Sequence, residues 1–160
     1  MTDLPLVQAI RTGPSSGPFA DTISLTHEER LVRRRRLVGA GGLAVLVDLP
    51  RMTALAPGDA LDLGDGRLIG VLAAPEALVE VRGDLPRLAW HIGNRHAPCQ
   101  IGPDCLIVRA ERVMEAMLQG LGAELKPVLA PFFPEGGAYG PAHGGGHEHG
   151  DGLDSLGALT

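Results

Sequence analysis

Three histidines stand close together near the end of the chain, in a stretch rich in glycine. They are His143, His147 and His149, half of the six histidines among 160 residues. Neutral imidazole is a good ligand for nickel, copper and zinc, and short His-rich tracts are typical of metal-binding segments. His147 and His149 are two residues apart, so their side chains fall on the same side of an extended chain. The spacing predicts capture of a borderline transition metal by this tail.

Metal capture by such a tail depends on pH. Imidazole binds a metal only when it is neutral, so capture is expected near neutral pH and release as protons compete for the ring. Glu148, between two of the histidines, could add a carboxylate oxygen, although a solvated surface charge is the simpler interpretation.

Two further histidines, His91 and His96, flank the predicted end of a helix. Five residues turn an ideal helix by about 500°, so these side chains would point about 140° apart and would not share one ion. His91 lies beside the apolar stripe, which favours a polar flanking role. His96 lies past the helix end, and a twofold dimer axis would supply it twice. The predicted metal ligands are therefore His96, His143, His147 and His149, with His91 as a further candidate.

Cys99 lies three residues after His96 and is another candidate ligand. A thiolate would make the site softer and favour zinc or copper(I) over nickel. The position of Cys99 on a predicted strand favours packing instead. Cys99 and the nearby Cys105 are expected to be reduced thiols of a cytosolic protein rather than a disulfide.

The composition restricts the class of protein. The net charge of -5 argues against nucleic-acid binding, because phosphate contacts need a cationic surface. The run Arg33-Arg34-Arg35-Arg36 is basic, but in an acidic chain it is better explained as a solvated face or a protein-contact patch. No segment approaches the ~20 apolar residues of a membrane span, and the N-terminus has no secretory pattern. We expect a soluble cytoplasmic protein that does not bind membranes.

Short apolar runs separated by turn residues predict an all-β domain over residues 1–72. Gly64-Asp65-Gly66-Arg67 has the composition of a hairpin turn. Proline at residue 50 is expected to end one strand, and residues 73–76 form the expected linker to a second domain. The strands are expected at residues 23–26, 31–32, 43–49, 61–63 and 68–72.

The second half of the chain predicts an α+β domain over residues 77–134. A strand over residues 77–82 precedes a helix that Asp84 caps and that Gly93 and Asn94 end. Two short strands, a second apolar-striped helix over residues 113–121 and a strand over residues 125–129 follow. The order β-α-β-β-α-β is the ferredoxin-like pattern. Residues 135–160 are too rich in glycine to form a core, so a disordered tail is expected.

The sequence shows no sign of a catalytic centre. It lacks the G-x-S-x-G, H-E-x-x-H and Walker patterns. Gly39-Ala40-Gly41-Gly42 is glycine-rich but is not followed by the lysine of a phosphate-binding loop. We therefore expect a protein that is not an enzyme.

Two sequence motifs resemble those of a known family. They are Gly93-Asn94-Arg95-His96 and the run Pro134-Glu135-Gly136-Gly137-Ala138-Tyr139-Gly140 ahead of the histidine-rich tail. Together with Asp48-Leu49-Pro50 and Ala73-Ala74-Pro75-Glu76, they resemble the UreE family of urease accessory metallochaperones over nearly the whole chain.

This resemblance implies a homodimer with an N-terminal β domain and a ferredoxin-like C-terminal domain. It implies that the dimer binds nickel and passes it through the urease accessory GTPase to the urease apoprotein. Zinc is a second candidate metal, because imidazoles accept both ions. The family's interface ligand falls on His96, and its C-terminal histidines fall on His143, His147 and His149. The short tail favours delivery over bulk nickel storage.

Two other functions remain compatible with the residues. One is a cytoplasmic nickel or zinc buffer without a delivery partner. The other is a peptide-binding chaperone module that uses the β domain and binds metal only incidentally.

Overall fold

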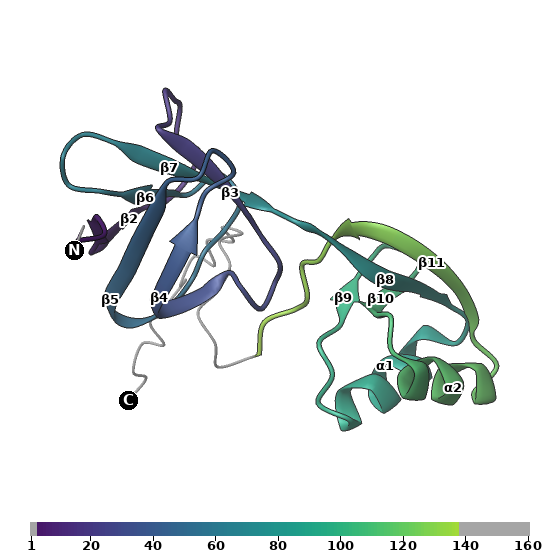
Figure 1. Ribbon diagram of the computed structural model, residues 1–160. Helices are drawn as coiled ribbons and strands as arrows, with labels where there is room; N and C mark the ends of the chain where they lie inside the picture. Colours follow the sequence, from purple (N-terminus) through teal and green to yellow (C-terminus); the bar gives the residue numbers. More distant parts are fainter. Residues whose placement is uncertain (1–2, 138–160) are drawn as a thin grey trace, which may run out of the picture.

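The computed structural model describes residues 3–137, and the remaining residues at both ends, including His143, His147 and His149, lie outside the described residues (Figure 1). Within residues 3–137 the chain forms eleven strands and two helices. The predicted α+β class is confirmed. Among the described residues, neither helix is long and apolar enough to cross a membrane.

The N-terminal part, residues 4–73, contains strands and connecting loops but no helix. One sheet has the order β1-β5-β4 and the other β2-β6-β7-β3. Their inward-facing aliphatic side chains, such as Val47 and Ile69, form one buried core. The strands are β1 (Leu6–Val7), β2 (Ala9–Arg11), β3 (Asp21–Leu25), β4 (Leu31–Val38), β5 (Ala44–Ala54), β6 (Ala60–Asp62) and β7 (Leu68–Ala73).

Strand β5 differs from the prediction that a strand ends at Pro50. It continues through the proline to Ala54, and its pairing with β4 shifts register in between. Val32 pairs with Thr53 and Arg34 with Asp48, so β5 carries extra residues at this point. Proline is tolerated in a strand at such an irregularity because no ladder hydrogen bond is required of its nitrogen.

Strand β4 also extends beyond the two residues predicted for it and includes the whole arginine run. Among the described residues β4 pairs only with β5, so its other edge is open. The side chains of Arg33, Arg34, Arg35 and Arg36 are all exposed. Of these four, only Arg35 has an ion pair in the described part of the chain, with Glu29 at 4.0 Å. We call this segment the arginine edge.

The connection between the two parts is shorter than predicted. Only Ala74 separates the end of β7 from the start of strand β8 (Pro75–Arg82), so most of the expected linker at residues 73–76 is strand. Figure 1 shows β8 as a long strand that leads from the N-terminal part into the second sheet.

The C-terminal part, residues 75–137, follows the predicted order of elements. Its four strands form one sheet of order β11-β8-β10-β9. Both helices lie over the same face of this sheet in Figure 1, and the second buried core lies between them and the strands. The elements after β8 are α1 (Leu85–Asn94), β9 (Gln100–Ile101), β10 (Leu106–Arg109), α2 (Arg112–Gly120) and β11 (Glu124–Pro131).

Helix α1 begins where the sequence predicted it. The side chain of Asp84 accepts a hydrogen bond from the Arg87 backbone N–H, and Pro86 occupies the first turn. The buried residues Leu88 and Ile92 fix the helix on the sheet. As a result, the end of α1 and the histidine that follows it have a defined position.

Candidate metal centre

His96 lies at the C-terminal end of α1 in a defined helix-ending motif. Its backbone N–H donates to the carbonyl of Gly93 at 3.0 Å, and the N–H of Ala97 donates to the carbonyl of Ile92 at 3.4 Å. This pair of bonds is the Schellman pattern, which requires a left-handed backbone at the residue in the His96 position. The Ala97 side chain packs on the core that contains Ile92. The backbone of His96 is therefore fixed, while its side chain is exposed.

The left-handed backbone is unusual for histidine. His96 has φ of 55° and is the one non-glycine residue with positive φ among residues 3–137. Helix α2 ends with the same pair of hydrogen bonds, made by Gly122 and Ala123, and there the left-handed residue is Gly122 with φ of 85°. A side chain in this conformation costs about 1–2 kcal/mol relative to glycine. Such strain clusters at functional sites, and here it favours a role for the imidazole.

The two helix ends provide a direct test of this strain. We expect His96→Gly to raise the free energy of unfolding by about 1 kcal/mol, because glycine adopts the left-handed backbone without strain. Conversely, Gly122→Ala should lower the free energy of unfolding by about 1 kcal/mol. An added Cβ meets no atom within 4 Å, so the cost comes from the left-handed backbone alone. Urea unfolding followed by circular dichroism would measure both changes.

His96→Ala is the matched control for this pair, because alanine keeps the strained conformation and should leave stability nearly unchanged. Equal stability of the glycine and alanine variants would show that His96 carries no backbone strain.

The start of the tail is fixed beside the loop that carries His96. The Glu135 N–H donates to the Cys99 carbonyl at 2.8 Å, and the Phe133 N–H donates to the Gln100 side-chain carbonyl oxygen at 2.9 Å. Cys99 follows His96 by three residues, and His143 follows Glu135 by eight. The chain that continues to the tail histidines therefore leaves the fold next to the His96 loop.

The structure favours the packing interpretation of Cys99. Its side chain is partly buried against the C-terminal core, and Cys99 and Cys105 are both free thiols. Burial raises the pKa of the Cys99 thiol, with a smaller opposing effect of a backbone hydrogen bond at Ile107 and a further rise from Glu135. A raised pKa disfavours the thiolate that would bind a metal.

His91 lies in the last turn of α1 and is half-buried. Its ring lies edge-on to Trp90, with centroids 5.0 Å apart and an interplanar angle of 84°. Within residues 3–137, no group of three histidine, cysteine or carboxylate side chains is positioned to hold a metal ion. A metal site that includes His91 or His96 would therefore need further ligands, either from a second copy of the chain or from residues outside 3–137.

Comparison with known families accounts for both parts of the chain. Residues 4–74 match the model of the UreE urease accessory protein, N-terminal domain, and residues 76–155 match that of the C-terminal domain. The chain belongs to the UreE family.

Individual UreE proteins are similar over most of their length. The urease accessory protein UreE of Rhodobacter capsulatus is 52% identical over 145 residues, which cover 89% of this chain and 93% of the relative. That of Cereibacter sphaeroides is 49% identical over 94% of this chain and 83% of the relative. That of Ruegeria pomeroyi is 48% identical over 92% of this chain and 99% of the relative. UreE proteins are accessory proteins rather than enzymes.

Two features of this UreE chain were not predicted from the sequence. The bond between Glu135 and Cys99 joins backbone groups, so no side-chain type marks it. The left-handed backbone of His96 was also missed, because glycine normally marks this position and here glycine lies three residues earlier, inside the helix. An exposed histidine directly after a helix that lacks a terminal glycine was the available clue.

Proposed function

We propose that the chain is a nickel metallochaperone. Two copies form a homodimer, and the His96 side chains of both copies hold Ni²⁺ at the interface. The tail histidines His143, His147 and His149 capture the ion, and the dimer delivers it through the urease accessory GTPase to the urease apoprotein. The hydrogen bond between Glu135 and Cys99 is the main support, because it fixes the start of the tail beside the His96 loop.

The arrangement of ligands supports a site shared between chains. His96 is exposed on a fixed backbone, and the described part of one chain offers no three-ligand group. A twofold axis near His96 doubles the number of imidazoles without any further histidine in the fold. Two imidazoles leave open positions on nickel for tail ligands and for the ligands of a recipient.

Transfer then proceeds by ligand exchange. Tail imidazoles bind the ion first, the paired His96 rings replace some of them, and ligands of the delivery partner replace His96 in turn. Each exchange keeps the ion coordinated, and protonation of the imidazoles favours release. Zinc can occupy the same nitrogen ligands, so selectivity for nickel comes from geometry and supply rather than from the imidazoles alone.

We assign separate roles to the two parts of the chain. Residues 77–134 form a ferredoxin-like domain for metal binding and dimerisation, supported by the observed element order and by the position of His96. Residues 1–72 form a β domain for binding a protein partner, and residues 135–160 are the metal-capturing tail.

Nickel titration calorimetry of the full chain and of a chain ending at Gly137 tests this proposal. The shorter chain includes both residues of the hydrogen bond between Glu135 and Cys99. We expect it to bind one tight nickel per dimer, and the full chain to bind additional nickel, because only the full chain has the tail imidazoles.

Loss of all tight binding in the shorter chain would contradict the interface site and would leave the tail as the only ligand source. The protein would then be better described as a metal buffer. Delivery itself is tested by nickel transfer to the purified GTPase, which a buffer would not accelerate.

A further inference from the structure

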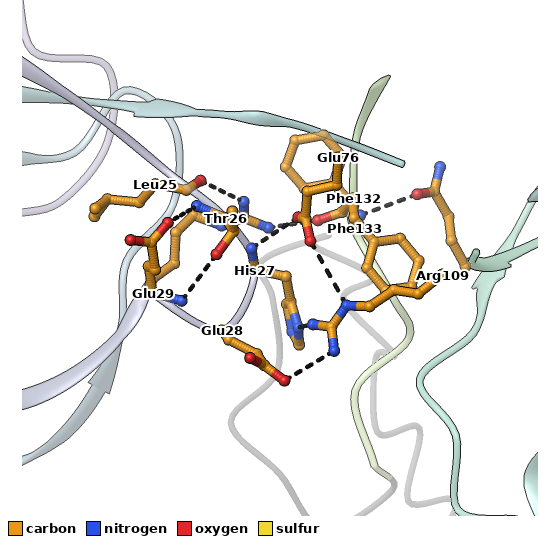
Figure 2. Close-up of polar contacts among 11 residues, drawn as sticks. Leu25, Thr26, His27, Glu28, Glu29, Glu76, Arg109, Phe132 and Phe133 are labelled. Atoms are coloured by element: carbon orange, nitrogen blue, oxygen red, sulfur yellow. Dashed lines mark hydrogen bonds and ion pairs between the residues drawn. The ribbon is translucent and has the colours of Figure 1, made fainter. Parts of the chain in front are cut away.

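A cluster of charged and aromatic side chains joins the two parts of the chain, far from His96 in the sequence. Its members come from the turn between β3 and β4, from β8, from the end of β10 and from the segment after β11, as Figure 2 shows. We call it the junction cluster, and it consists of His27, Glu28, Arg30, Glu76, Arg109 and Phe132.

Arg109 makes most of the polar contacts across the junction. Its Nη1 donates to a Glu28 carboxylate oxygen at 2.9 Å, its Nη2 lies 3.1 Å from Nδ1 of His27, and its Nε lies 3.6 Å from Glu76. The backbone N–H of His27 adds a bond to the other Glu76 oxygen at 2.9 Å. A guanidinium group has no acceptor, so Nδ1 of His27 must accept, and the ring must be neutral with its proton on Nε2.

Phe132 closes the junction from the C-terminal side. It is fully buried, and its ring meets the His27 ring edge-on at 5.8 Å and lies 5.5 Å below the Arg109 guanidinium. Arg30, only 5% exposed, donates from Nη1 to the Leu25 carbonyl at 3.1 Å and from Nη2 to the Phe132 carbonyl. Water is thus largely excluded from one side of His27.

We propose that the junction cluster is a proton-operated latch between the N-terminal and C-terminal parts of the chain. When Nδ1 of His27 takes up a proton it becomes a donor that faces the Arg109 donor, so their hydrogen bond is lost. The imidazolium also places a positive charge beside Arg109 and Arg30. Glu28 and Glu76 offset part of this charge, but both already accept from Arg109 or from the His27 backbone. The closed junction therefore requires His27 to be neutral.

The electrostatic environment of His27 agrees with this arrangement. Burial lowers the His27 pKa from 6.5, Arg109 and Arg30 lower it further, and Glu76 and Glu28 raise it by less. The closed form therefore binds fewer protons than the open form. The stabilisation of the closed junction relative to the open one is complete at pH values above the ordinary histidine pKa. This stabilisation is lost as the pH falls below the ordinary histidine pKa and through the lower pKa that His27 has in the closed form. The latch is expected to be closed at neutral pH and to open under mild acid. This inference does not depend on metal binding.

Small-angle X-ray scattering of the full chain, together with its molar mass, tests the latch. Between about pH 8 and about pH 5 the radius of gyration of the wild type should increase, because His27 becomes protonated in this range. His27→Gln should abolish the increase, since the amide oxygen can still accept from Arg109 but cannot be protonated. The matched control His91→Gln should retain the increase, because His91 lies outside the junction cluster.

Arg109→Met is a second variant, which removes the partner of His27 at any pH. Already at about pH 8 it should have the larger radius of gyration that we expect of the wild type only in acid. An unchanged radius in the wild type, or an equal increase in His27→Gln, would overturn the proposal. Proton NMR of the His27 ring adds an independent readout that does not need the variants to fold identically. A His27 pKa that is not lower in the wild type than in urea would also overturn it.

Discussion

Replacing His96 with alanine is expected to remove tight nickel binding from the folded part of the protein. In a chain ending at Gly137 the affinity for nickel should fall by more than about 100-fold, because loss of a partner that merely orients a ligand already costs about 10- to 100-fold. In the proposed dimer both copies lose the His96 imidazole at once, so neither copy keeps a ligand for the ion. Calorimetric titration with nickel measures the affinity and the stoichiometry.

Two matched variants separate ligand loss from structural damage. His91→Ala removes a histidine from the same helix and should leave tight binding unchanged, because its ring packs beside Trp90. His96→Gly should lose nickel as completely as His96→Ala while the protein becomes more stable. If the alanine variant bound nickel as tightly as the wild type, the interface site would be refuted.

Replacing Phe132 with alanine is expected to give the largest loss of stability among the variants proposed. The ring is fully buried at the junction of the two parts. Its removal leaves a cavity beside His27 and Arg109, and large-to-small changes of this kind cost about 3–5 kcal/mol. Urea unfolding monitored by circular dichroism measures this change in the free energy of unfolding.

Phe133→Ala is the control, because the neighbouring ring is 47% exposed and lies against Arg30 on the outside of the junction. We expect this variant to lose about 1 kcal/mol or less, as exposed sites generally do. Similar losses in the two variants would mean that Phe132 does not join the two parts as described.

The sequence predicted those elements whose apolar residues follow a regular period. Both helices of the C-terminal part were found because their buried residues recur at helical spacing, as Leu88 and Ile92 do on α1. The hairpin of β6 and β7 was predicted from its glycine-rich turn. The two strands pair as predicted, with Asp62 opposite Leu68 next to the turn.

Elements whose apolar residues follow no period were predicted only in part or were missed. The middle of β4 has four consecutive exposed arginines, so the alternation of buried and exposed residues that marks a strand is absent. Strand β5 passes through Pro50, which normally ends a strand, because a register shift accommodates it. The short strands β1 and β2 have too few residues to carry a pattern.

The candidate site was predicted in part. The residue type of His96 and its place after the helix predicted a ligand role. Its left-handed backbone was not predicted, because it depends on where α1 ends, and the sequence around Gly93 and Asn94 does not determine that point. The junction cluster could not be predicted at all, since Arg109 and His27 are 82 residues apart in the chain. Such contacts follow from the arrangement of the two parts rather than from any local pattern.

The arginine edge has a consequence for how copies of this protein can associate. An open strand edge normally invites the same edge of another copy, which leads to sheet extension and aggregation. Here that approach would bring Arg33, Arg34 and Arg36 of one copy against those of the next, and in the described part of the chain these three have no ion pair to neutralise them. Like-charge repulsion therefore protects this edge from self-association, and the proposed dimer is expected to form elsewhere on the surface.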